Sequence, residues 1–267
     1  MRNIALGRYI PGNTIIHKLD PRAKIICMFL MLISIFIDTG FIGYVVLGFL
    51  TVLCLLLAGL TFDYIWQAVK PMLMMMAFLL VINILVTKTG NVVLKIGPIE
   101  IFDDALYQTI YVIVRLILMI MITTILTSTT KPLELTLGIE ELLTPFARIG
   151  VPAHEIAMMI SIALRFIPTL IEETERIIKA QSSRGVDFEH GKLMEKVNAI
   201  VSLIVPLFVS AFQRAEDLAN AMEARGYVTD GHRTRYKQLH ITLKDFVAMA
   251  ICAIVLGGLI YYAVVIK

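Results

Sequence analysis

Long apolar runs separated by short polar stretches constrain the fold of this chain more than any other feature. The run that closes the sequence, 246–266, has 21 residues without a charge, and a helix needs about 20 such residues to cross a bilayer. Hydrophobic residues make up 58% of the 267 residues and charged residues only 17%, whereas soluble domains are about half apolar and a quarter charged. The pattern therefore predicts an all-α integral membrane protein.

Five transmembrane helices are predicted from the apolar runs 25–37, 41–60, 71–87, 105–127 and 246–266. The first run reaches spanning length only if its helix begins near Pro21, which places Arg22 and Lys24 at the lipid headgroups. Lys and Arg are enriched on the cytoplasmic side of membrane proteins. A cytoplasmic N-terminus puts 19 of these residues inside and two outside, so we expect the N-terminus in the cytoplasm and the C-terminus outside.

Three segments follow from this topology: 1–128 with the first four membrane helices, 129–241 as a cytoplasmic region, and 242–267 with the last helix. The middle segment has helical periodicity over 132–149, 151–183 and 192–224. The two longer helices each have an apolar first half and a charged second half. An apolar stretch of 16 residues is about 24 Å long, short of the membrane core, so we expect these helices to lie against the inner membrane face as long amphipathic helices.

Both long helices end with the same short pattern. "KAQSSRG" runs from Lys179 to Gly185, and "NAMEARG" runs from Asn220 to Gly226. A glycine just past a helix supplies the left-handed conformation that ends it, and an arginine beside it presents five donors in a fixed fork. One such ending is ordinary helix capping, but two with identical spacing indicate two contact sites for cytoplasmic partners. The candidate partner-binding residues are Ser183, Arg184, Gly185, Ala224, Arg225 and Gly226.

Sequence motifs for chemistry are missing. The sequence has no GxxxxGK[ST] phosphate-binding loop, and no Ser/His/Asp grouping or carboxylate pair stands in a plausible site. Cys27, Cys54 and Cys252 lie singly in apolar runs without metal-ligand spacing. We therefore expect no catalytic residue, no cofactor and no metal site, and the net charge of +3 gives no argument for a nucleic-acid partner.

The chain resembles the transmembrane T component of energy-coupling factor (ECF) transporters, in the family that includes the corresponding cobalt and biotin transport subunits. "SSRG" and "EARG" resemble the paired Ala-Arg-Gly motifs at the ends of that family's coupling helices, and "HKLDPRAK" (17–24) resembles its N-terminal segment. The likeness covers essentially the whole chain. Ser183 stands where the motif has alanine, and serine is equally small.

The resemblance implies a scaffold that is not itself an enzyme, in the cell membrane of a prokaryote. In this family two ABC-type ATPases each take one Arg-Gly helix end. A small membrane protein, the S component, binds a vitamin or metal ion and docks on the coupling helices. The implied function is to transmit the motion of the ATPases to the S component.

Several features have a second interpretation. Arg115, inside the fourth run, either has a structural partner in the helix bundle or lines a substrate path with Asn83. The segment 17–24 either anchors the first helix at the headgroups or contacts a partner, and the methionine-rich stretch 72–76 is either membrane packing or an adaptable partner surface. The alternative functions are a stand-alone permease that binds its own substrate and a membrane enzyme of lipid metabolism.

Overall fold

The computed structural model describes residues 9–86, 89–96, 99–149, 152–188, 192–228 and 239–265. Packing divides the chain into two compact units. The first consists of Met1–Ala153 and Leu239–Lys267, and the second is His154–Gln238. This division follows contacts between residues, whereas the segments 1–128, 129–241 and 242–267 concern the sides of a membrane and stay a prediction.

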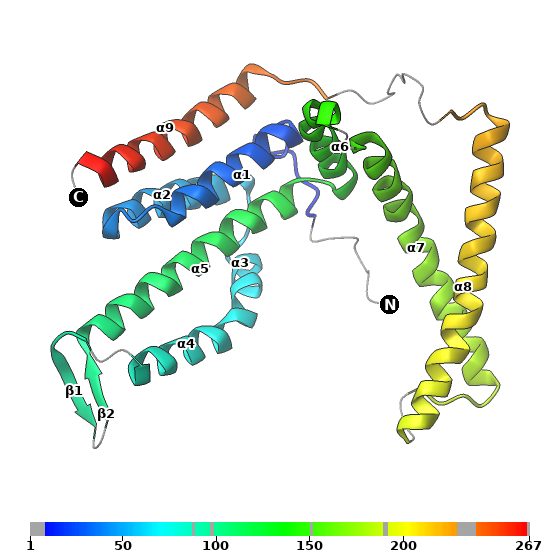
Figure 1. Ribbon diagram of the computed structural model, residues 1–267, viewed down its shortest axis with the longest axis horizontal. Coiled ribbons are helices and arrows are strands. Elements are labelled where there is room, and N and C mark those ends of the chain that lie inside the picture. Colours follow the sequence, from blue (N-terminus) through cyan, green and yellow to red (C-terminus); the bar gives the residue numbers. More distant parts are fainter. Residues whose placement is uncertain are drawn as a thin grey trace. The chain divides into compact units, whose positions relative to one another are not determined.

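Helices α1 (Pro21–Phe36), α2 (Gly40–Ala58), α5 (Asp103–Thr129) and α9 (Leu243–Val265) form the core of the first unit (Figure 1). α1 packs against the other three. Its start is well defined, because the side chain of Asp20 accepts from the backbone N–H of Arg22 at 2.9 Å and proline occupies the first helical position. The buried core of the bundle consists of Met31, Ile35, Tyr44, Leu47, Leu118, Ile122, Cys252 and Leu259.

A bent helical stretch packs along α5. It runs through α3 (Phe62–Val69), the short 3-10 turn η1 (Lys70–Met72) and α4 (Leu73–Val86). The predicted span begins at Pro71, but the helical stretch begins nine residues earlier, at Phe62. The reason is that the proline lies in the 3-10 turn between two helices and does not start one. Together the stretch is 25 residues long.

Two short strands follow α4 and add a small β element to an otherwise helical fold. β1 (Val92–Ile96) and β2 (Ile99–Phe102) pair antiparallel, with Lys95 opposite Glu100. The fold then continues from β2 into α5 (Figure 1). The hairpin was not predicted from the sequence.

Helix α6 (Pro132–Leu143) and the 3-10 helix η2 (Thr144–Ile149) complete the first unit. α6 packs against the first turn of α1. Gly138 makes this close approach possible, since a Cβ there would lie 3.1 Å from the Cβ of Pro21.

The second unit is a pair of long crossing helices, α7 (Ala153–Ser183) and α8 (Leu193–Ala224) (Figure 1). An ion pair joins Arg214 Nη2 to Glu173 Oε2 at 2.9 Å, and Gln181 Nε2 donates to the carbonyl of Ser202 at 3.3 Å. A later residue of α7 thus meets an earlier residue of α8, so the helices run antiparallel. Their C-terminal ends lie at opposite ends of the pair.

Within the described residues, six helical stretches are long and apolar enough to cross a membrane. Three of the five predicted spans appear as α2, α5 and α9, and residues 71–86 of the third run form the second part of the stretch Phe62–Val86. The first run forms α1, which begins at Pro21 as its length required, but its 16 residues span only about 24 Å, so it is not among the six.

The remaining two of the six are α7 and α8, which sequence analysis placed along the membrane surface. They are long enough because each helix continues past its internal proline, Pro168 or Pro206, to a total length of 31 or 32 residues. The length of about 24 Å that was worked out from 16 apolar residues is therefore shorter than either helix. Both helices are charged toward their C-terminal ends, as the sequence predicts.

Candidate functional site

The two Arg-Gly endings have the same backbone geometry. After α7, the N–H of Val186 donates to the carbonyl of Gln181 at 3.1 Å, and after α8 the N–H of Tyr227 donates to the carbonyl of Met222 at 3.0 Å. This long bond closes a Schellman cap. The glycine between them is left-handed in both, with φ of 87° at Gly185 and 72° at Gly226.

Hydrogen bonds between residues three apart are repeated as well. The N–H of Arg184 donates to Gln181 at 3.0 Å, and that of Arg225 donates to Met222 at 3.2 Å. The N–H groups of the two glycines donate to the carbonyls one residue further along, those of Ser182 and Glu223, at 3.0 and 2.9 Å. These three backbone hydrogen bonds of one ending thus each have a counterpart in the other, 41 residues later.

The six candidate residues are all exposed in the second unit. A Cβ added at either glycine would meet no atom within 4 Å, so the glycines are required by backbone conformation and not by lack of space. Among the described residues, neither Arg184 nor Arg225 has an acidic side chain within ion-pair distance. The structure thus presents two equivalent, open guanidinium groups on fixed helix ends, which suits binding to carboxylates or carbonyl oxygens.

The apolar halves of α7 and α8 are largely uncovered within the second unit. On α8 the exposed fraction is 61% for both Phe208 and Phe212, whose rings contact each other at 4.6 Å between centroids. On α7 Met159 is 60% exposed. Exposed apolar area of this extent marks a contact with lipid or with another protein.

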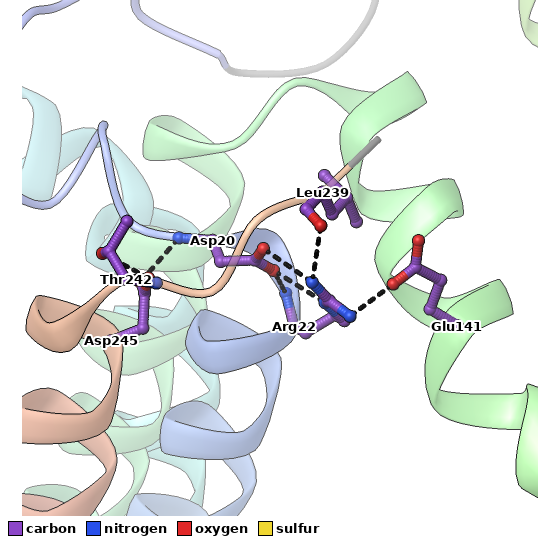
Figure 2. Close-up of polar contacts among 6 residues, drawn as sticks. All are labelled: Asp20, Arg22, Glu141, Leu239, Thr242 and Asp245. Carbon is purple, nitrogen blue, oxygen red and sulfur yellow. Dashed lines mark hydrogen bonds and ion pairs between the residues drawn. The ribbon is translucent and has the colours of Figure 1, made fainter. Parts of the chain in front are cut away.

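A second group of polar residues lies in the first unit, at the start of α1 (Figure 2). We call it the polar clamp: Asp20, Arg22, Glu141, Thr242, Asp245 and the carbonyl of Leu239. Arg22 donates from Nε and Nη2 to the two carboxylate oxygens of Asp20, both at 3.1 Å, and from Nη2 to the Leu239 carbonyl at 3.1 Å. Its Nη1 pairs with Glu141. One guanidinium therefore joins the start of α1 to α6 and to the segment before α9.

Asp245 forms the other half of the polar clamp. Its carboxylate is fully buried and accepts from the N–H of Asp20 at 2.8 Å, and from the N–H and hydroxyl of Thr242 at 2.7 and 2.6 Å (Figure 2). The first helix and the last helix of the chain are thereby held together at one end.

Lys24 is turned into the protein. Its side chain is nearly buried, and Nζ donates to the carbonyls of His17 and Thr129 at 3.2 and 3.0 Å and to the Thr130 hydroxyl at 3.4 Å. Sequence analysis offered two roles for the segment 17–24, an anchor at the headgroups or a partner contact. Arg22 and Lys24 bind other parts of the first unit, and both roles of the segment stay predictions. The spacing of the sequence gave no sign that the partners of Arg22 come from α6 and the segment before α9, or that those of Lys24 come from the segment before α1 and the end of α5.

Arg115 and Asn83 have structural partners inside the bundle. Arg115 Nε donates to the Tyr44 hydroxyl at 3.0 Å, and its guanidinium lies 5.7 Å from the ring centroid of Phe36. Asn83 Nδ2 donates to the Thr109 hydroxyl at 3.1 Å. These contacts match the structural role considered for Arg115 and do not join the two residues in one polar path.

The comparisons with known proteins agree with one another. A family model described as cobalt transport protein matches residues 12–236. A relative from Thermosediminibacter oceani is 46% identical over 248 residues, covering 93% of both chains. A relative from Bacillus subtilis (strain 168) is 44% identical and covers 98% of both, and one from Clostridium kluyveri is 44% identical over 96% of this chain and 95% of its own.

All three relatives bear the name energy-coupling factor transporter transmembrane protein EcfT. The match extends over nearly the full length of each, and the apolar helices of this chain suit a multi-pass membrane protein. The chain therefore belongs to the cobalt transport protein family, in which its relatives are transmembrane proteins of ECF transporters.

Proposed function

We propose that this chain is the energy-coupling scaffold of an ECF-type ABC importer. It transmits the motion of two ABC-type ATPases through α7 and α8 to a small membrane S component that takes up a vitamin or a metal ion. The names of the relatives support the transporter class. The observation that carries the coupling role is the repeated helix ending, with matching backbone bonds and, among the described residues, no acidic side chain paired with either arginine.

Each ending takes one ATPase subunit. Arg184 and Arg225 provide the charged contact, the small residues Ser183 and Ala224 let a partner backbone approach, and the two glycines hold the tips in place. Because Gln181 near the end of α7 contacts Ser202 and α8 continues to Ala224, about 33 Å of helix separates the two endings. That separation leaves room for two similar partners, one at each end.

The exposed apolar halves of the same helices receive the S component. A helix pair that is charged at its two tips and apolar along its first halves offers both contacts on one rigid element. Movement of the tips by the ATPases is then carried directly to the surface under the S component. The chain supplies no chemistry of its own, and ATP hydrolysis belongs to the partners.

The scaffold lies in the cell membrane of a prokaryote, with its N-terminus in the cytoplasm and its C-terminus outside. The distribution of Lys and Arg supports this orientation. In this arrangement α7 and α8 lie along the inner membrane face, where their charged halves reach water. A stand-alone permease is less well supported, since Arg115 and Asn83 bond to Tyr44 and Thr109 of their own bundle.

The test reverses the charge of both tips. The double variant Arg184→Glu and Arg225→Glu is expressed in its own host, purified in mild detergent, and assayed for bound ATPase and for uptake of substrate. We expect loss of both ATPases and of uptake. Arg176→Glu is the matched control, because Arg176 is an exposed arginine of the same helix α7 outside its ending. Normal ATPase binding and uptake in the double variant would refute the proposal.

A further inference from the structure

The first unit contains an apolar cavity of about 530 Å³ between α1, α2, α5 and α9. This volume lies in the range of ligand-binding pockets, about 300–1,000 Å³. Its walls are mainly aliphatic, and the three cysteines of the chain, Cys27, Cys54 and Cys252, all line it. The cavity plays no part in the proposed coupling between ATPases and S component.

The cavity is open on the side of α2 and α9. Leu53 and Leu57 of α2 and Val247 and Ile251 of α9 line it, and their exposed fractions are 41%, 44%, 52% and 46%. These side chains belong to helices that are apolar enough to span a membrane. The opening therefore faces the hydrocarbon region of the bilayer, where lipid chains are the available occupants.

Two lysines line the cavity, and they differ in what they bind. Lys24 donates to three oxygens of the protein, so its donors are already used. Lys244 lies in the first turn of α9, is exposed, and has no acidic side chain within ion-pair distance among the residues described. A lysine whose stem covers apolar surface while its ammonium reaches the interface is placed to meet a headgroup.

We propose that this cavity binds one anionic phospholipid, with an acyl chain between α2 and α9 and the phosphate on Lys244. The apolar walls fit the chain, and the positive charge at one end selects an anionic headgroup over a zwitterionic one. Basic pockets between membrane helices on the cytoplasmic side have this lipid preference. The distribution of Lys and Arg assigns the start of α9 to the cytoplasmic side, so the lipid comes from the inner leaflet.

The test begins with occupancy. The full chain is reconstituted in vesicles of equal parts phosphatidylglycerol and phosphatidylcholine, extracted in mild detergent, and analysed by native mass spectrometry. We expect one retained phosphatidylglycerol. Ala248→Trp fills the cavity and removes the lipid, whereas Ala250→Trp retains it, because Ala250 is exposed on α9 and does not line the cavity. Equal retention by both variants would overturn the proposal.

Selectivity is tested at the lysine. Near a membrane surface one lysine is worth about fivefold in binding of an anionic lipid, so Lys244→Gln lowers the ratio of retained phosphatidylglycerol to phosphatidylcholine by about fivefold. Lys70→Gln is the control, since Lys70 is an exposed lysine of the same unit that does not line the cavity. An unchanged ratio in Lys244→Gln would refute the headgroup contact.

The native cysteines give a readout that needs no variant. Because all three line the cavity, an occupying lipid shields them from N-ethylmaleimide. We expect slower alkylation of the wild-type chain in detergent after addition of a limiting amount of phosphatidylglycerol than after addition of the same amount of phosphatidylcholine. Equal alkylation rates in the two lipids would contradict selective binding, even if the tryptophan variants fail to fold.

Discussion

The polar clamp offers the sharpest test of how this chain is held together, and Arg22→Met is the change that breaks it. Methionine keeps an unbranched apolar stem in place of the arginine stem while removing the charge and all five donors. The variant loses the two bonds to Asp20, the bond to the Leu239 carbonyl and the ion pair with Glu141. Helix α1 then loses its side-chain links to α6 and to the segment before α9.

The expected destabilisation follows from burial. The side chain of Arg22 is 19% exposed and that of Asp20 is 2% exposed, so the variant leaves a buried carboxylate without its cation. Removing one partner of a buried ion pair costs about 3–5 kcal/mol. Asp20 still accepts from the backbone N–H of residue 22, which places the loss at the lower end, about 3 kcal/mol. That corresponds to a fall of about 6–12 °C in the melting temperature of a unit this size.

Thermal unfolding is measured with a thiol-reactive dye. Cys27, Cys54 and Cys252 are buried or partly buried, and all three belong to the first unit, so they react as that unit opens. Lys70→Met is the matched control. It removes one positive charge from an exposed position of the same unit, and we expect a change of less than about 1 kcal/mol. If Arg22→Met melts within two degrees of Lys70→Met, the polar clamp does not stabilise the first unit.

Three further predictions concern single positions. Gly185→Ala and Gly226→Ala each destabilise their helix ending by about 1 kcal/mol because φ is positive at both glycines, so amide hydrogen exchange in the last helical turn becomes about fivefold faster. The control Gly257→Ala, in the middle of α9, shows no such increase. Equal exchange rates in all three variants would contradict the cap assignment. Arg115→Leu lowers the free energy of unfolding by about 1–2 kcal/mol, because it loses the hydrogen bond to Tyr44 and the contact with the Phe36 ring. Substrate uptake per folded complex is unchanged. A stable variant without uptake would show a transport role instead. Lys24→Met leaves three acceptors without their donor and costs about 2–3 kcal/mol in the same dye assay; a variant as stable as wild type would refute this.

Three of the apolar runs predicted their helices well, even though the run of α5 contains Arg115. α2, α5 and α9 match their runs within a few residues at each end, because length and hydropathy alone set such a helix. The run that begins at Pro71 was cut short by Lys70 and Asp63, which lie inside the helical stretch Phe62–Val86. Pro71 begins that run, whereas in the structure it lies in the 3-10 turn between α3 and α4.

The β hairpin was missed although the sequence carries a signal for it. Residues 92–102 read "VVLKIGPIEIF", in which a Gly-Pro pair separates two stretches rich in β-branched residues. Only the lysine of this stretch entered the predictions, in the count that gave the membrane orientation. The paired helix endings were found because both the residue types and their spacing repeat, and the structure adds that their backbone hydrogen bonds repeat too.

The polar clamp and the cavity could not be predicted in the same way. Asp20 and Asp245 are 225 residues apart in sequence, and the pattern around each indicates only a helix start. Their contact depends on how α1 packs against α9, which no local pattern specifies. Likewise, the three cysteines appear isolated in the sequence and share one cavity wall only after the bundle has formed.

The central claim is that the two helix endings are the contact sites for two ATPase subunits. The most direct measurement is site-specific photocrosslinking in the native membrane, with a photoreactive amino acid placed at Ser183 in one variant and at Ala224 in another, both exposed positions beside the arginines. The account predicts that each position forms an adduct with an ATPase subunit, identified by mass spectrometry. Adducts at neither position, in membranes where the ATPases co-purify with the chain, would contradict it.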